Sequence, residues 1–124
     1  MKQTILIVED EADLAAGCAR LLRRRGWRVV TAATCEAALV AVGGAHRPAL
    51  AIVDRHLPDG DGFDVLREAC TTGTPVIIIT DQASTGARLI ALDKGAAGFL
   101  GKPFSTQALM DLVHSVVGSP NAAR

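Results

Sequence analysis

Short apolar runs alternate along this chain with longer stretches whose apolar residues recur at helical spacing. The short runs have the length and composition of buried strands and cover residues 4–8, 27–31, 49–53, 76–80 and 98–100. The longer stretches fit helices and cover residues 13–25, 34–42, 63–70, 83–94 and 105–117. Strands that alternate with helices predict a parallel sheet, because each parallel connection has to cross over the sheet. We therefore expect an α/β fold with a doubly wound, five-stranded parallel sheet in a three-layer sandwich.

The length and charge of the chain limit what else it can be. Its 124 residues fit one domain, which we expect over residues 1–118. Residues 119–124 are small and polar, as in a tail or the start of a linker. The formal net charge of +0 argues against direct binding of nucleic acid or of an anionic membrane by this domain.

The cysteine content and the absence of long apolar runs indicate where in the cell the protein is expected. Cys18, Cys35 and Cys70 are odd in number and have no CxxC spacing, which argues against a disulfide framework and against a zinc site. No signal segment opens the chain, and no apolar run is long enough to cross a bilayer. We expect a cytoplasmic protein without membrane contact.

Polar residues stand where the predicted strands end. Glu9 and Asp10 follow the first strand, Asp54 the third, Thr80 closes the fourth, and Lys102 follows the fifth. Ligands of such sheets bind beyond the carboxyl ends of the strands, so these residues mark the expected site. Carboxylates that meet there repel one another, and a hard divalent cation with oxygen ligands, Mg²⁺, is the expected remedy.

The same residue types suit phosphoryl transfer. An aspartate can act as a nucleophile and form an acyl phosphate. Catalysis of this transfer consists mostly of positioning and of neutralising charge at the transferring group. Mg²⁺ and Lys102 would neutralise the phosphoryl oxygens, and Thr80 could donate a hydrogen bond to one of them.

Four segments of the chain resemble response-regulator receiver domains, the phosphorylated switches of two-component signalling. They are Ile5-Leu6-Ile7-Val8-Glu9-Asp10-Glu11, Asp54 with Leu57-Pro58-Asp59-Gly60-Asp61-Gly62, Thr80, and Lys102-Pro103-Phe104 after Gly95-Ala96. The resemblance extends from about Thr4 to Val117. It implies the flavodoxin-like strand order 2-1-3-4-5.

The resemblance also implies roles at the expected site. Asp54 would be the phosphoacceptor, and Lys102 would pair with the phosphoryl group or, in its absence, with Asp54. Asp10, Asp54 and the backbone carbonyl of His56 would bind Mg²⁺, and Glu9 would do so directly or through water. The Lys102–Pro103 peptide bond would be cis.

A second set of implied roles concerns switching. Thr80 would turn toward the new phosphoryl group, and Phe99 would move inward into the vacated space. These movements would change the face formed by the fourth helix, the fifth strand and the fifth helix. A sensor histidine kinase or a histidine phosphotransfer protein would donate the phosphoryl group.

Four positions depart from the family pattern or modulate it. Relatives usually have a small residue after the threonine, whereas this chain has Asp81, so we expect slower phosphorylation. Glu9 replaces the commoner aspartate and keeps its charge. His56 and Gln82 occupy positions that tune dephosphorylation in relatives.

Other functions compete with the phosphorylated switch. A pseudo-receiver that docks proteins without taking phosphate is the main alternative, and Asp81 is its best support. A phosphatase would need a substrate-binding cap, for which no insertion is long enough, so we expect no enzyme beyond assisted phosphorylation and dephosphorylation of Asp54. A nucleotide- or flavin-binding domain would need a glycine-rich phosphate loop after the first strand, and there is none. An output domain or downstream protein and a homodimer stay open.

Overall fold

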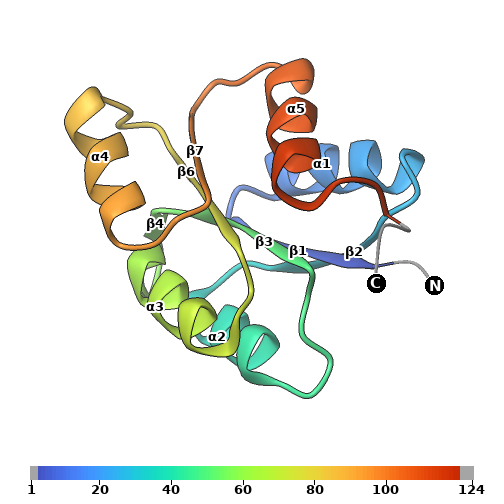
Figure 1. Ribbon diagram of the computed structural model, residues 1–124, viewed down its shortest axis with the longest axis horizontal. Coiled ribbons are helices and arrows are strands. Elements are labelled where there is room, and N and C mark those ends of the chain that lie inside the picture. Colours follow the sequence, from blue (N-terminus) through green and yellow to red (C-terminus); the bar gives the residue numbers. More distant parts are fainter. Residues whose placement is uncertain (1–2, 121–124) are drawn as a thin grey trace.

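The computed structural model describes residues 3–120, and its centre is one parallel sheet (Figure 1). The strands are β1 (Thr4–Val8), β2 (Arg28–Ala32), β3 (Leu50–Asp54), β6 (Val76–Thr80) and β7 (Gly98–Gly101). They lie side by side in the order β2-β1-β3-β6-β7, and every pairing is parallel. Counted along the sheet-forming strands alone, this is the order 2-1-3-4-5, so the predicted flavodoxin-like fold is confirmed.

Helices cover both faces of the sheet (Figure 1). The helices α1 (Ala12–Arg24) and α5 (Thr106–Val117) lie on one face, and α2 (Cys35–Gly43), α3 (Gly62–Thr72) and α4 (Thr85–Asp93) lie on the other. Alternate residues of each central strand enter different cores: Ile77 and Ile79 pack with α1 and α5, whereas Val76 and Ile78 pack with α2 and α3. The central strands read as unbroken apolar runs because both of their faces are buried.

The helix boundaries follow local signals in the sequence. Gly26 ends α1 with φ +98°, a conformation that favours glycine, and Trp27 N–H then donates to Leu22 O. This turn keeps Trp27 out of β2, so the strand predicted from residue 27 begins one residue later. The helix predicted from residue 83 begins at Thr85, because the Ser84 hydroxyl accepts a hydrogen bond from Ala87 N–H and caps α4.

The loop expected at residues 57–62 contains a small hairpin. β4 (His56–Leu57) and β5 (Gly60–Asp61) pair in antiparallel fashion directly after β3. The Asp61 side chain accepts a hydrogen bond from Phe63 N–H and caps α3. The hairpin therefore returns the chain to the end of β3 and starts α3 beside Asp54.

The last described residues of the predicted tail lie against the domain. Pro120 O accepts a hydrogen bond from Gln3 N–H, and the Pro120 ring is in contact range of Gly26. The rest of that tail, residues 121–124, lies outside the described residues. Within residues 3–120, none of the helices combines the length and the apolar character that crossing a bilayer requires.

Candidate functional site

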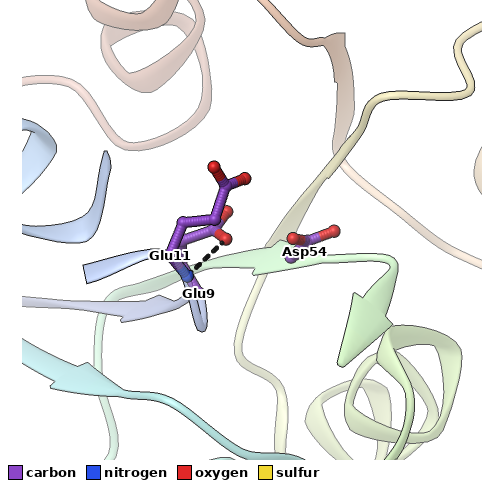
Figure 2. Close-up of side chains that lie close together, drawn as sticks. All are labelled: Glu9, Glu11 and Asp54. Carbon is purple, nitrogen blue, oxygen red and sulfur yellow. Dashed lines mark hydrogen bonds between the residues drawn. The ribbon is translucent and has the colours of Figure 1, made fainter. Parts of the chain in front are cut away.

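Acidic side chains from β3 and from the segment after β1 converge at the carboxyl edge of the sheet (Figure 2). Carboxylate oxygens of Glu9, Glu11 and Asp54 lie within 4.8 Å of one another. Glu9 and Asp54 are buried, because they directly continue or end buried central strands. Glu11 N–H donates to Glu9 Oε2 over 3.1 Å, which fixes the turn between β1 and α1.

One ammonium group lies among these carboxylates. Lys102 Nζ is 2.9 Å from Glu9 Oε1, 2.9 Å from Glu11 Oε1 and 2.9 Å from Asp54 Oδ2. Its contacts with Glu11 and Asp54 are hydrogen bonds. Its approach to Glu9 does not have hydrogen-bond geometry, so Glu9 Oε1 is buried without a hydrogen-bond partner among the described residues.

The sheet and a cis bond position Lys102. Its backbone N–H donates to Thr80 O over 2.7 Å, which joins the segment after β7 to the end of β6. The Lys102–Pro103 peptide bond is cis, as the resemblance implies. The side chain is only 13% exposed and reaches back across the sheet edge toward Asp54.

Burial and charge act in opposite directions on this cluster. Burial raises the pKa of Glu9 above its ordinary value, and the nearby charge of Asp54 adds to the rise, although contacts with Lys102 and with Glu11 N–H partly offset it. Burial alone would lower the pKa of Lys102, but its contacts with Glu9, Asp54 and Glu11 outweigh burial and raise that pKa. Three carboxyl groups surround one ammonium group, so the cluster has an excess of acidic groups and can accommodate a cation.

Backbone contacts fix the Asp54 carboxylate from the other side. His56 N–H donates to Asp54 Oδ1 over 3.1 Å, so each carboxylate oxygen has one partner. Gly62 N–H donates to Arg55 O over 2.7 Å, and a Cβ at Gly62 would collide with the Asp54 carbonyl oxygen. Glycine is therefore required at the start of α3, where the backbone lies directly against the backbone of Asp54.

The predicted site residues are not all in contact. Asp10 is exposed and is not one of the three carboxylates that meet, within the part of the chain that the structure describes. His56 and Gln82 have exposed side chains at the same edge of the sheet, and Asp81 is exposed directly after β6. Their predicted roles stay predictions.

Glu11 is the member of the cluster to which sequence reasoning gave no role. It belongs to the acidic segment after β1, but the sequence does not show which of the three consecutive carboxylates join the cluster. The available signal was its place directly before α1, where Glu11 has the backbone position of an N-cap. Its side chain makes no cap hydrogen bond and contacts Lys102 instead.

Thr80 and Phe99 line a cavity beside the cluster. The Thr80 hydroxyl oxygen accepts a hydrogen bond from Gln82 N–H over 3.1 Å. Both side chains border a cavity of about 380 Å³ that Ile90 of α4 also lines. Ala91 is the one fully buried residue of α4. The helix next to this cavity is thus lightly packed on the rest of the fold.

Comparison with known proteins decides the family. Residues 5–114 match the family described as the response regulator receiver domain. The chain is a response regulator receiver domain. Its backbone resembles that of the non-phosphorylated HemR receiver domain from Leptospira biflexa with a TM-score of 0.86 and 30% identity, over 99% of this chain and 98% of that one. A CheY-like receiver domain protein from Methanospirillum hungatei resembles it with a TM-score of 0.85 and 27% sequence identity, over 93% of each chain.

Curated relatives of this receiver domain are longer proteins. The KDP operon transcriptional regulatory protein KdpE of Escherichia coli is 36% identical over 101 residues, which are 81% of this chain and 44% of that protein. The DNA-binding response regulator MtrA of Mycolicibacterium paratuberculosis is 33% identical over 116 residues, which are 93% of this chain and 51% of that protein. The receiver domain thus spans about half the length of these relatives.

Proposed function

We propose that this receiver domain accepts a phosphoryl group on Asp54. The observation that carries the proposal is the pairing of Lys102 Nζ with Asp54 Oδ2 at 2.9 Å, while the other carboxylate oxygen is held by His56 N–H. An Asp54 oxygen would attack the phosphorus, the bond from phosphorus to the donor would break, and an acyl phosphate would form. Lys102 would remain near enough to neutralise the phosphoryl oxygens as they gain charge.

The residues present fit Mg²⁺, the cation proposed for this site. Glu9 Oε1 is a buried carboxylate oxygen without a hydrogen bond, and the surrounding donor atoms are all oxygens. We propose that Glu9, Asp54, the neighbouring Asp10 and the backbone carbonyl of His56 hold the ion. Bound there, Mg²⁺ would supply neutralising charge for an anionic phosphodonor.

The proposed signal passes from Thr80 to Phe99. A phosphoryl oxygen would offer the Thr80 hydroxyl proton a strong acceptor, and the side chain would turn toward it. Phe99 would then move further into the cavity that the two residues share with α4. Because α4 is lightly packed, a small change in this cavity can favour a second arrangement of α4, β7 and α5.

The phosphodonor and the output are proposed at the level of class. We propose a sensor histidine kinase or a histidine phosphotransfer protein as donor, acting in the cytoplasm, where the three free cysteines would stay reduced. The longer relatives are named as transcriptional and DNA-binding regulators, which supports an output domain or a downstream protein that acts on transcription. The receiver domain would assist phosphorylation and dephosphorylation of Asp54 without acting on a separate substrate.

Intact mass spectrometry tests the proposal. The protein is incubated with acetyl phosphate, with and without Mg²⁺, beside Asp54→Ala. We expect one added phosphoryl group that depends on Mg²⁺ and is absent from the variant. No adduct, under conditions that modify another receiver domain, would contradict the proposal and favour a pseudo-receiver that docks proteins without phosphate.

A further inference from the structure

Glu11 lies at the rim of the acidic cluster and contacts the ammonium group of Lys102. Its side chain is 64% exposed, against 0% for Glu9 and 7% for Asp54, and its Oε1 is 2.9 Å from Lys102 Nζ. Glu11 starts α1 without capping it, so the start of this helix does not explain the orientation of the side chain. The contact that the side chain does make is with a residue 91 positions away in the sequence.

The hydrogen bonds of Lys102 are distributed unequally among its neighbours. An ammonium has three protons to donate. Two go to Glu11 and Asp54, whereas the buried Glu9 Oε1 at the same distance receives none. The exposed Glu11 carboxylate therefore receives a hydrogen bond from Lys102 that the buried Glu9 oxygen lacks.

We propose that Glu11 is a positioning residue that restrains Lys102 in the unphosphorylated receiver domain. A phosphoryl group on Asp54 would bring new anionic oxygens beside Lys102, and these oxygens would compete with Glu11 for the ammonium group. The restraint stabilises the resting state and so slows phosphorylation. This inference rests on the proposed phosphorylation of Asp54.

Two substitutions separate the contact from the charge. Glu11→Asp keeps the charge but is one methylene shorter and loses the contact with Lys102, whereas Glu11→Gln keeps the length and loses the charge. Asp13→Asn is the matched control, because Asp13 is an exposed acidic residue in the first turn of the same helix. The rate of phosphorylation by acetyl phosphate is measured at saturating Mg²⁺ for each protein.

We expect both Glu11 variants to be phosphorylated faster than the wild type, by roughly two- to fivefold, as loss of a partly exposed ion pair allows. Asp13→Asn should match the wild type. An unchanged rate for Glu11→Asp, with equal acceleration in Glu11→Gln and Asp13→Asn, would show that charge alone matters and would overturn the proposal. A slower rate in both Glu11 variants would overturn it as well.

A second measurement reads the contact without phosphodonor or Mg²⁺. Nitrogen-edited NMR of the lysine ammonium groups should show slow exchange of the Lys102 protons with water in the wild type and faster exchange in Glu11→Asp. Equal exchange rates of the Lys102 ammonium protons in the two proteins would overturn the proposal that Glu11 restrains Lys102. If the wild type takes no phosphoryl group at all, the proposed function fails, whereas the NMR result still reports on Glu11.

Discussion

At the scale of single residues, Lys102 compensates carboxylates that would otherwise repel one another. Glu9 and Asp54 are buried where a charge is costly, and both lie 2.9 Å from its ammonium group. The compensation is incomplete, since Glu9 Oε1 has no hydrogen bond among the described residues. Such a locally unfavourable arrangement is typical of a functional site rather than of a core built for stability.

Asp81 is expected to slow the reaction at Asp54. It is exposed directly after β6, whose Ile79 pairs with Asp54 across the sheet. A carboxylate at about 4 Å from an anionic phosphodonor repels it by about 1 kcal/mol in water, which sets the upper range of the effect. We therefore expect Asp81→Ala to speed phosphorylation by acetyl phosphate by roughly two- to fivefold. Asp93→Ala, at the far end of α4, removes an exposed carboxylate as a control and should leave the rate unchanged. Equal rates for the wild type and Asp81→Ala would contradict this role.

Gly62 is expected to tolerate no side chain. A Cβ there would meet the carbonyl oxygen of Asp54 and lie 3.0 Å from Arg55 Cα, so backbone would have to move. Gly62→Ala should lower the free energy of unfolding by at least about 2 kcal/mol in urea titrations. Gly17→Ala is the matched control in the interior of α1, where a Cβ would meet no atom within 4 Å. This substitution should raise the free energy of unfolding by about 0.5–1 kcal/mol. Equal effects of the two substitutions would refute the close approach at Gly62.

At the scale of elements, periodicity predicted the five sheet strands and five helices, with ends that differ by up to two residues. The strand Val76–Thr80 matches its predicted bounds, because a β-branched apolar run of five residues that follows Pro75 is too short for a helix. The hairpin of β4 and β5 was missed, since two-residue strands have no periodicity to detect. The start of α4 was misplaced, because the Ser84 cap was not recognised as its N-terminal signal.

The hairpin also supports a helix distant from it in sequence. Asp59 accepts hydrogen bonds from the N–H groups of Cys35 and Glu36 over 2.7 and 3.0 Å, at the start of α2. These two bonds lower the pKa of Asp59 below its ordinary value. The ionised carboxylate therefore stabilises the folded protein above the unfolded-state pKa, and this contribution is lost as pH falls through the lowered folded-state pKa.

Asp59→Asn should accordingly destabilise the protein in a pH-dependent way. The amide is a weaker acceptor for two N–H donors, so the thermal midpoint at pH 7 should be lower than in the wild type. The difference between the two proteins should shrink as the pH is lowered through the acidic range. A difference that is constant with pH would show that the charge of Asp59 does not act on α2.

At the scale of the whole molecule, stability and chemistry are placed in different regions. The two apolar cores flank the central strands, and the charged cluster lies at the carboxyl edge of the sheet, where no core residue covers it completely. The sequence predicted this edge because four strand ends carry polar residues. It could not predict that Glu11 rather than Asp10 turns toward Lys102, since that choice depends on the turn between β1 and α1.

This arrangement predicts that the site lowers the stability of the fold. Burial raises the pKa of Glu9, so the folded protein binds its proton more tightly than the unfolded chain, and stability falls as pH rises through that pKa. Glu9→Gln removes the buried charge and should raise the free energy of unfolding by about 1 kcal/mol relative to the wild type at pH 7 in EDTA. The difference in free energy of unfolding between the variant and the wild type should be smaller at lower pH. It should also be smaller in Mg²⁺, because Glu9 is proposed to help to hold the ion. A lower free energy of unfolding for Glu9→Gln than for the wild type in EDTA would contradict the expected cost of burying the Glu9 carboxylate.

The most direct test of the central claim is to locate the phosphoryl group. The protein is phosphorylated with acetyl phosphate and Mg²⁺, the acyl phosphate is reduced with borohydride, and the modified residue is identified by peptide mass spectrometry. Phosphorylation of Asp54 predicts reduction at that residue alone. Reduction at Glu9, Asp10 or Glu11 with Asp54 unmodified would contradict the assignment of the nucleophile and of Lys102 as its partner.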